Sequence, residues 1–348
     1  MQRIGIIGHF GGENFFVDGQ TVKVRSFVEG FEKYAPEFKL DKVDSYYAKK
    51  SPIKFMYSFI KCLLFDKKIV FFPATNSRKI LFPLFYYLGK FTNKEFYHDC
   101  IAGSMNKHIQ ERPIWAKYLS SYKANWMESP LQVDLLKKQG VNPVSYMPNF
   151  KHLEPVPENE LNRVEYTKPY KFCIFSRIES LKGIEDALVA LSEVNRLNPN
   201  SVFLDIYGPI QPGSENWFDT VLKKYDSICK YCGMVKPNDS VGTVKNYVAL
   251  LFPTQYFTEG MPGTIVDSMF AGVPVIARRW MWCDNMIKDR YNGLVYEFDQ
   301  PDKLKDILLE VVENVDIIRK MKKNCLLESE KYTAKPTIMK ILKEMNLK

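Results

Sequence analysis

The 348-residue sequence has no long apolar run and no low-complexity tract. No window of about 18 apolar residues is free of Lys, Arg and Asp, and the first residues run directly into a strand-like apolar segment. Hydrophobic residues make up 46% and charged residues 26% of the chain, as in folded globular proteins. We therefore expect a cytoplasmic protein that is neither secreted nor membrane-spanning.

Cysteine is sparse and scattered, and its number, seven, is odd, which argues against a disulfide framework. Cys229 and Cys232 form the one close pair, but no second pair or nearby histidine completes a set of metal ligands, so we interpret them as buried thiols. The chain also lacks an Asp-x-Asp pair that could hold a divalent cation. The sequence thus predicts no metal site and no bound cofactor.

Acidic residues are fewer than basic ones, and the formal net charge is +9. Residues 1–167 hold 24 Lys and Arg against 17 Asp and Glu (+7), whereas residues 168–348 hold 25 against 23 (+2). The first half is therefore expected to meet an anionic partner. We find no recognised nucleic-acid module, so nucleic acid is not predicted as that partner.

Basic and apolar residues are mixed most closely in residues 49–68, which contain six lysines, one acid and many aromatic and aliphatic side chains. This composition suits a helix that lies on an anionic membrane surface. A core helix with a solvated lysine face would have the same composition. The sequence leaves both interpretations open.

Strand-like and helix-like segments alternate along the chain, which predicts parallel α/β architecture, and the length favours two domains. Prolines and acids mark residues 150–169 as a linker. In the first half, Gly11 and Gly12 follow the first strand, where a glycine loop allows close approach to a ligand or makes a plain tight turn. His98 and Asp99 stand at a strand end, where open α/β sheets bind ligands. A buried structural histidine remains the alternative for His98.

In the second half, Arg177 and Lys182 lie in a loop between a strand at 170–175 and a helix. Two cations in such a loop can converge on a diphosphate, although as isolated residues they could be ordinary surface charges. Two further strand-like segments end before Gly208 and at Met234-Val235, as the strand at 170–175 ends before the loop with Arg177.

The most informative stretch is residues 251–277, which reads as strand end, loop, helix and strand. Gly260, Pro262 and Gly263 predict a turn, and the helix start at Gly263-Thr264 would offer backbone N–H groups and a positive dipole end to a phosphate. Glu259 and Asp267 border this start, and carboxylates accept hydrogen bonds from sugar or ribose hydroxyls. An ordinary strand-loop-helix unit with a solvated Glu is the plain alternative.

This stretch resembles the donor-site motif of family 4 retaining glycosyltransferases. The matching positions are Pro253, Glu259, Gly260, Pro262, Ala271, Gly272, Pro274, Val275 and Ile276. Asp267 stands where the family has its second Glu. Arg177 and Lys182 fall in a segment similar to the family's G-R-x-x-x-x-K-G, and His98-Asp99 is similar to its H-D strand end.

The resemblance implies the GT-B fold, two Rossmann-like domains with parallel sheets facing across a cleft. Residues 1–165 would bind the acceptor, with a last helix at 332–348 crossing back to them, and residues 166–331 would bind the donor. The implied catalytic residues are Glu259, Arg177, Lys182 and His98. The implied donor-binding residues are Gly11, Gly12, Gly208, Met234, Val235, Gly260, Met261, Pro262, Gly263, Thr264 and Asp267.

The implied reaction is metal-independent transfer of a sugar, with retention, from a nucleotide-diphosphate sugar (UDP- or GDP-linked) to a hydroxyl of a glycan or lipid-linked glycan. A peripheral enzyme at the inner face of a membrane, assembling a bacterial capsule or similar surface polysaccharide, would combine this reaction with the basic first half. Two alternatives remain: another GT-B-like enzyme, such as a sugar-nucleotide epimerase or a phosphorylase, and a catalytically silent partner that binds the sugar nucleotide.

Overall fold

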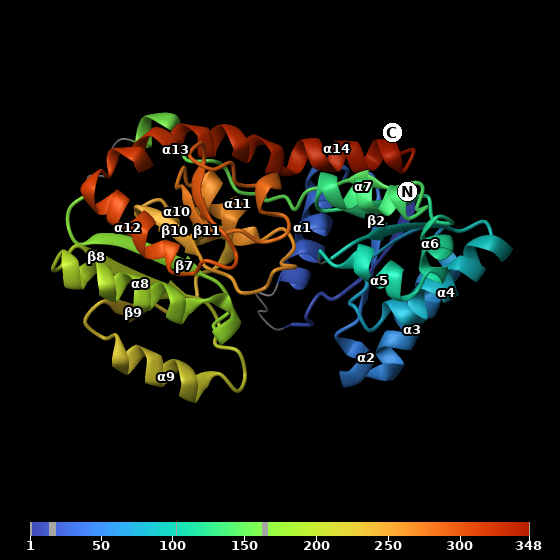
Figure 1. The fold of residues 1–348 in the computed structure, drawn as a ribbon. Helices are drawn as coiled ribbons and strands as arrows, with labels where there is room; N and C mark the ends of the chain where they lie inside the picture. Colours follow the sequence, from blue (N-terminus) through green and yellow to red (C-terminus); the bar gives the residue numbers. More distant parts are fainter. Residues whose placement is uncertain (1, 14–18, 102, 162–165, 348) are drawn as a thin grey trace. The chain divides into compact units, whose positions relative to one another are not determined.

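The computed structural model describes residues 2–13, 19–101, 103–161 and 166–347, which form two compact units. The first unit comprises Met1–His152 and Tyr332–Lys348, and the second comprises Leu153–Lys331. Each contains a parallel sheet of six strands with helices packed on it (Figure 1). The prediction of two Rossmann-like units with parallel sheets is confirmed.

The boundary between the units follows His152, earlier than the expected break after residue 165. The reason is that the proline-rich segment packs on the second unit. The backbone N–H of Val156 donates to the Phe270 carbonyl at 2.8 Å, and Lys322 Nζ donates to the Leu161 carbonyl at 2.7 Å.

The sheet of the first unit has the strand order β2-β1-β3-β4-β5-β6. Its strands are β1 (Arg3–Gly8), β2 (Lys39–Asp44), β3 (Lys68–Phe71), β4 (Glu95–Asp99), β5 (Ala124–Met127) and β6 (Ser145–Tyr146). Its helices are α1 (Gly19–Tyr34), α2 (Tyr47–Lys50), α3 (Pro52–Phe65), α4 (Arg78–Phe91), α5 (Met105–Glu111), α6 (Ile114–Leu119), α7 (Pro130–Lys138) and α14 (Ala334–Glu344).

Apolar side chains cover both faces of this sheet, as buried parallel strands require. Along β3, Val70 points into a core formed with α1 and α14, whereas Ile69 and Phe71 point into a second core formed with α3, α4, α6 and α7. The strands β3 and β5 are therefore buried throughout, and β4 is buried after its first residue, Glu95. Their apolar runs made them recognisable in the sequence.

The helix α14 packs against α1 at Gly30, where the absence of a side chain leaves room. A Cβ atom at Gly30 would lie 2.5 Å from Ile338 Cδ1, so the two helices approach closely only because this residue is glycine. Trp126 Nε1 also donates a hydrogen bond of 2.6 Å to Glu344 Oε2. Residues from both ends of the chain thus build one core.

The sheet of the second unit has the strand order β12-β11-β10-β7-β8-β9. Its strands are β7 (Tyr170–Phe175), β8 (Val202–Tyr207), β9 (Cys229–Tyr231), β10 (Ala249–Phe252), β11 (Val275–Arg278) and β12 (Gly293–Tyr296). Its helices are α8 (Ile184–Leu197), α9 (Glu215–Lys224), α10 (Ser240–Val244), α11 (Gly263–Phe270), α12 (Lys303–Glu313) and α13 (Asp316–Ser329). Short 3-10 helices lie at Glu158–Glu160 (η1), Ser180–Lys182 (η2), Pro237–Asp239 (η3), Cys283–Asn285 (η4) and Glu330–Tyr332 (η5).

Two helices, α12 and α13, replace the single helix that periodicity predicts over residues 304–321. Asn314 leaves the helical conformation, and its side-chain oxygen accepts a hydrogen bond of 3.2 Å from the Asp316 N–H, which starts the next helix. The helix α8 packs against α12, and α11 packs against both α10 and α13 (Figure 1). None of the helices in the described part of the chain is both long and apolar enough to cross a bilayer.

The contact of α14 with α1 makes a direct prediction for stability. Ile338 is fully buried, so Ile338→Ala should lower the free energy of unfolding by about 2–4 kcal/mol, the usual cost of such a cavity. The matched control is Met339→Ala on the same helix, because Met339 is 51% exposed and should matter little. Urea unfolding of both variants provides the measurement, and equal losses would contradict this packing.

Candidate functional site

The second sheet changes direction between β7 and β10, and this point defines the candidate site. From β7 the chain proceeds outward to β8 and β9, and it then returns to the other side of β7 for β10. The carboxyl ends of β7 and β10 therefore lie next to each other, and open α/β sheets bind ligands at such switch points. The loops that leave these two ends contain Arg177 and Lys182 on one side and Glu259 on the other.

Glycine allows the two loops to touch. Gly183 has a φ of 73°, and a Cβ atom there would lie 2.0 Å from the Pro253 carbonyl oxygen, so no other residue fits without a shift. Beside it, the backbone N–H of Gln255 donates to the Leu181 carbonyl at 2.8 Å. The loop after β7 is thus fixed to the loop after β10 through backbone contacts.

An ion pair joins the two loops at their polar side. Lys182 Nζ lies 2.5 Å from Glu259 Oε2, and both side chains are largely buried. The Thr254 hydroxyl lies 3.4 Å from the same carboxylate oxygen, and the Lys182 ammonium lies 4.9 Å from the centre of the Tyr256 ring. The structure therefore brings together the two residues that the sequence assigned to the diphosphate and to the sugar.

Arg177 joins this group through two residues that the sequence analysis did not assign. Arg177 Nη2 lies 3.0 Å from Glu179 Oε1, and the Tyr256 hydroxyl donates to Glu179 Oε2 at 3.0 Å. Burial and the hydrogen bond to Glu179 raise the pKa of Tyr256, so its hydroxyl stays protonated and able to donate. Arg177, Glu179, Tyr256, Lys182 and Glu259 thus form one network, which we call the donor-site network.

The helix α11 begins beside this network. Its N-cap is Pro262, which supplies no side-chain cap, and the buried hydroxyl oxygen of Thr264 has no hydrogen-bond partner among the described residues. Asp267 lies one turn further and is 7% exposed. The predicted helix start at Gly263-Thr264 is therefore present, with polar groups that could contact an anion.

The segment after β11, which contains Trp280 and Met281, packs against the turn at Gly260. Trp280 is buried, its ring packs edge-on to Phe252, and its Nε1 donates to the Gly260 carbonyl at 3.3 Å. The backbone N–H of Met281 donates to the Phe257 carbonyl at 2.8 Å. Met261 is buried in the same turn. The segment after β11 thus holds the loop that contains Glu259.

Gly208 brings the end of β8 against the loop that begins at Ser176. It has a φ of 138°, and a Cβ atom there would lie 1.7 Å from the Ser176 carbonyl oxygen. The backbone N–H of Gly208 donates to the Gly233 carbonyl at 2.9 Å, which places the next turn alongside. In that turn Met234 is 57% exposed and Val235 is partly buried. Both therefore remain accessible to a base or sugar at this edge.

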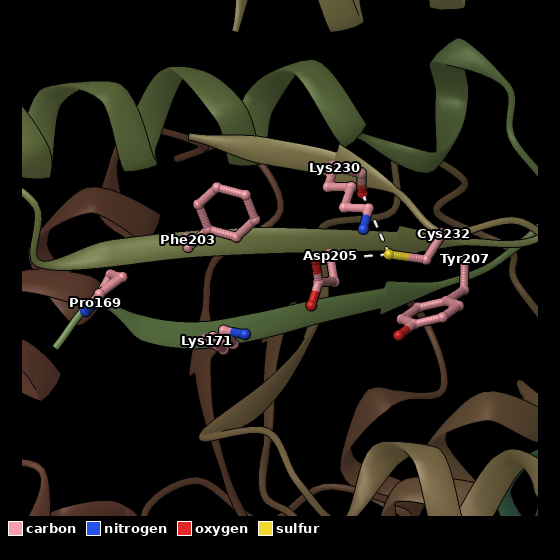
Figure 2. Close-up of a pocket in the computed structure, with 7 residues that line it drawn as sticks. All are labelled: Pro169, Lys171, Phe203, Asp205, Tyr207, Lys230 and Cys232. Atoms are coloured by element: carbon pink, nitrogen blue, oxygen red, sulfur yellow. Dashed lines mark hydrogen bonds between the residues drawn. The ribbon is translucent and has the colours of Figure 1, made fainter. Parts of the chain in front are cut away.

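A separate pocket of about 490 Å³ lies on the face of β7, β8 and β9 (Figure 2). Its lining residues are Pro169, Lys171, Phe203, Asp205, Tyr207, Lys230 and Cys232. The Asp205 carboxylate already has two hydrogen-bond partners, because it accepts from the Tyr247 hydroxyl at 2.8 Å and from Cys232 Sγ at 3.6 Å. None of the predicted donor-site residues lines this pocket.

In the first unit, the glycine loop after β1 is built around the Asp44 carboxylate. The carboxylate accepts hydrogen bonds from the backbone N–H groups of Phe10, Gly12 and Tyr46, at 2.7–2.9 Å. Gly11 and Gly12 have φ values of 81° and 60°, so both need the conformational freedom of glycine. The loop lies at the switch point between β1 and β3, but the N–H of Gly12 is already committed to Asp44.

His98 lies in the interior of the first unit. Its ring has no exposed surface and packs against Phe71 and Phe82, and its Nδ1 lies 3.1 Å from Asn125 Oδ1. Its buried Nε2 has no partner in the described part of the chain. Burial, reinforced by the Arg78 charge, lowers the pKa of His98 to about 3. This placement fits the structural histidine that the sequence left open.

The neighbouring Asp99 belongs to a buried ionic cluster at the carboxyl end of the sheet. Lys23 Nζ lies 2.5 Å from Asp99 Oδ1, 2.9 Å from Glu128 Oε1 and 3.0 Å from the Cys100 carbonyl. Burial raises the pKa of Asp99 to about 6, although Lys23 opposes this shift. The cluster joins α1 to the ends of β4 and β5. Among the described residues, no group of three or more His, Cys, Asp or Glu side chains could hold a metal ion.

Comparison with solved structures identifies the class of the fold. HepE of Anabaena, solved with UDP and glucose, superposes with a TM-score of 0.73 over 99% of this chain and 100% of that chain, at 11% identity. The sucrose-phosphate synthase of Thermosynechococcus elongatus gives a TM-score of 0.78 over 99% of this chain and 98% of its own, at 13% identity. At these identities the likeness concerns the fold, which is that of the GT-B glycosyltransferases.

Sequence comparison finds relatives of the second unit. Residues 157–326 match the family of glycosyl transferases group 1. The alpha-monoglucosyldiacylglycerol synthase of Acholeplasma laidlawii is 29% identical over 160 residues, which are 46% of this chain and 39% of that protein. An uncharacterized glycosyltransferase of Methanocaldococcus jannaschii is 18% identical over 162 residues, 47% of this chain and 41% of that protein. The second unit is therefore similar to the group 1 glycosyl transferases, and the chain matches about two fifths of the length of these relatives.

The buried position of His98 predicts a pH effect on stability. Its pKa is lower in the fold than in the unfolded chain, where it is about 6.5, so unfolding takes up a proton and stability is lost as pH falls below about 6.5. His98→Phe keeps a ring but removes this titration. The advantage of parent over variant should shrink by about 2 kcal/mol between pH 7 and pH 5.

Urea unfolding at both pH values measures this difference. Comparison with the variant is essential because Asp99, whose pKa is raised, contributes a slope of opposite sign over the same range. An advantage that does not change with pH would show that His98 takes up a proton in the folded state.

Proposed function

We propose that the protein transfers a sugar from a nucleotide-diphosphate sugar to a hydroxyl group, with retention of the anomeric configuration. The observation that carries the proposal is the donor-site network at the switch point of the second sheet. Departure of the nucleoside diphosphate breaks the bond from the sugar C1 to the phosphate oxygen, and the diphosphate keeps the electron pair. The acceptor oxygen forms the new bond to C1, and its hydroxyl proton passes to the departing diphosphate. Arg177, Lys182 and the start of α11 supply positive charge for that leaving group.

Glu259 has two roles in this proposal. Its ion pair with Lys182 fixes the ammonium in the loop, so the cation is in place before the donor arrives. Its carboxylate can also accept hydrogen bonds from sugar hydroxyls, and Asp267 can accept from the ribose. Met234, Val235 and Gly208 line the edge at which the base would lie.

The acceptor in this proposal is a glycan or lipid-linked glycan of the cell surface, such as a bacterial capsule, and the enzyme works at the inner face of the membrane. The relatives support a nucleotide-sugar donor, because HepE was solved with UDP and with UDP-glucose. The named product of the Acholeplasma relative is an alpha-linked glucolipid, which favours retention and a lipid-type acceptor.

Product analysis tests the proposal against its alternatives. Purified protein is incubated with UDP- or GDP-sugars and candidate lipid-linked acceptors, and the products are examined by NMR. Transfer with an unchanged anomeric configuration supports the proposal. Isomerised donor, a requirement for orthophosphate, or binding without any turnover would indicate an epimerase, a phosphorylase or a silent partner.

The diphosphate site predicts the effect of removing its cations. Arg177→Ala or Lys182→Ala should each lower turnover by roughly two to three powers of ten, the scale for losing one preorganised charge donor. The matched control is Arg196→Ala, because Arg196 is exposed on α8 and lies outside the network. Turnover at the parent rate in both site variants would place the donor elsewhere.

The fixed cations also predict the response to chelators. Since Arg177, Lys182 and the helix start carry the leaving-group charge, sugar transfer should persist in excess EDTA. Initial rates before and after dialysis against EDTA provide the measurement. Loss of activity that Mg²⁺ or Mn²⁺ restores would sink the metal-independent mechanism.

A further inference from the structure

Two neighbouring helices of the first unit present apolar stripes to solvent. The stripe on α3 consists of Ile53, Tyr57, Ile60 and Leu64, and the stripe on α4 consists of Ile80, the half-buried Leu84, Tyr87 and Phe91. Both stripes have the same spacing, in steps of four, three and four residues, which keeps each on one side of its helix. Exposure reaches 86% at Ile53 and 74% at Phe91. We call these eight residues the α3–α4 surface.

The buried sides of the two helices fix the direction of these stripes. Of the 14 described residues of α3, Phe59 and Cys62 are the buried ones, and α4 buries Phe82 and Phe85. Phe59 stacks on Phe85 with ring centroids 6.4 Å apart, so the helices are neighbours on one face of the sheet (Figure 1). Their outer sides therefore point away from that same face. An amphipathic helix that only covers a core would turn its apolar stripe inward.

The charge of the protein is concentrated in the same segment. Residues 45–94 contain ten Lys and Arg and one Asp, a net charge of +9, which equals the net charge of the whole chain. The acid, Asp66, is buried and ion-paired with Arg3. Lys68 and Arg78 are also buried, so the charge at the surface comes from the remaining eight lysines. The exposed lysines around the α3–α4 surface are Lys49, Lys50, Lys54, Lys67, Lys79 and Lys90.

We propose that the α3–α4 surface, with its surrounding lysines, docks the protein on an anionic lipid bilayer. An exposed patch of aliphatic and aromatic side chains marks an interaction site, and a ring of lysines is complementary to anionic headgroups. A second copy of the chain is a poorer occupant, because it would place like charges opposite each other. The inference rests on the proposed function in one respect, that the membrane is where the lipid-linked acceptor lies.

The inference goes beyond the lysine-rich segment at 49–68, because α4 contributes half of the surface. The stripe of α4 contains Tyr87 and Phe91, whose rings stack with centroids 6.4 Å apart. Aromatic side chains of this kind favour the headgroup region, and lysine stems can lie along apolar surface with the ammonium in water. Two helices with parallel roles should bind a bilayer far more tightly than one.

Co-sedimentation of the full chain with vesicles tests the proposal. The vesicles contain equal parts of phosphatidylglycerol and phosphatidylcholine, or phosphatidylcholine alone. The parent should bind the anionic vesicles and dissociate as salt is added. Two double variants should each weaken binding by roughly tenfold or more. One combines Tyr87→Ser with Phe91→Ser on α4, and the other combines Ile53→Ser with Leu64→Ser on α3. Lys79→Glu with Lys90→Glu should weaken it and reduce its salt dependence.

The matched control is the double variant Val189→Ser with Leu197→Ser on α8. These two side chains are 46% and 52% exposed, and the variant should bind vesicles as the parent does. Equal binding to both kinds of vesicle, or binding unchanged by the α4 pair, would overturn the proposal. A dimer in lipid-free buffer that the α4 pair abolishes would assign the surface to a second copy instead. The assay needs no donor sugar, so a failure here leaves sugar transfer untouched.

Discussion

The ion pair between Lys182 and Glu259 is the interaction on which the donor-site network depends. It joins loops that leave the carboxyl ends of β7 and β10, two strands that are adjacent only because the sheet reverses direction between them. The close approach of Gly183 to Pro253 makes the pair possible, since a larger residue would separate the loops. Sheet topology, one glycine and one ion pair thus place a cation and a carboxylate at the edge where α/β folds bind ligands.

The surroundings of this pair explain how its geometry is kept. Tyr256 and Glu179 extend the network to Arg177. The buried Trp280 donates a hydrogen bond to the carbonyl of Gly260, the residue after Glu259, and so holds this turn in place. Preorganised charges of this kind cost little reorganisation when negative charge develops on a leaving group. The family match over residues 157–326 coincides with the unit that contains all of these residues.

Much of this arrangement could be predicted from the sequence, because it is local. The strand, glycine turn and helix start from Leu251 to Phe270 are encoded by neighbouring residues, and the apolar runs of buried parallel strands identify both sheets. Long-range relations could not be predicted. Glu179 and Tyr256 are ordinary loop residues until the fold brings them together.

The direction in which a side chain points could not be predicted from the sequence either. Periodicity places His98 at a strand end but does not tell whether its ring points into the core, as it does here beside Phe71. The stripe on α4 resembles a normal core face in the sequence, and only the position of Phe82 and Phe85 shows that it points to solvent. At Asn314 the backbone leaves the helical conformation and the side chain accepts a hydrogen bond from the Asp316 N–H, neither of which the apolar pattern records.

The most direct test of the account is the affinity of the protein for nucleoside diphosphates, measured by titration calorimetry with UDP and with GDP. One of them should bind at one site per chain, and Lys182→Ala should weaken this binding by roughly tenfold to a hundredfold, the worth of a hydrogen bond to a charged group. Arg196→Ala should bind like the parent. An affinity that Lys182→Ala leaves unchanged would contradict the assignment of the donor site.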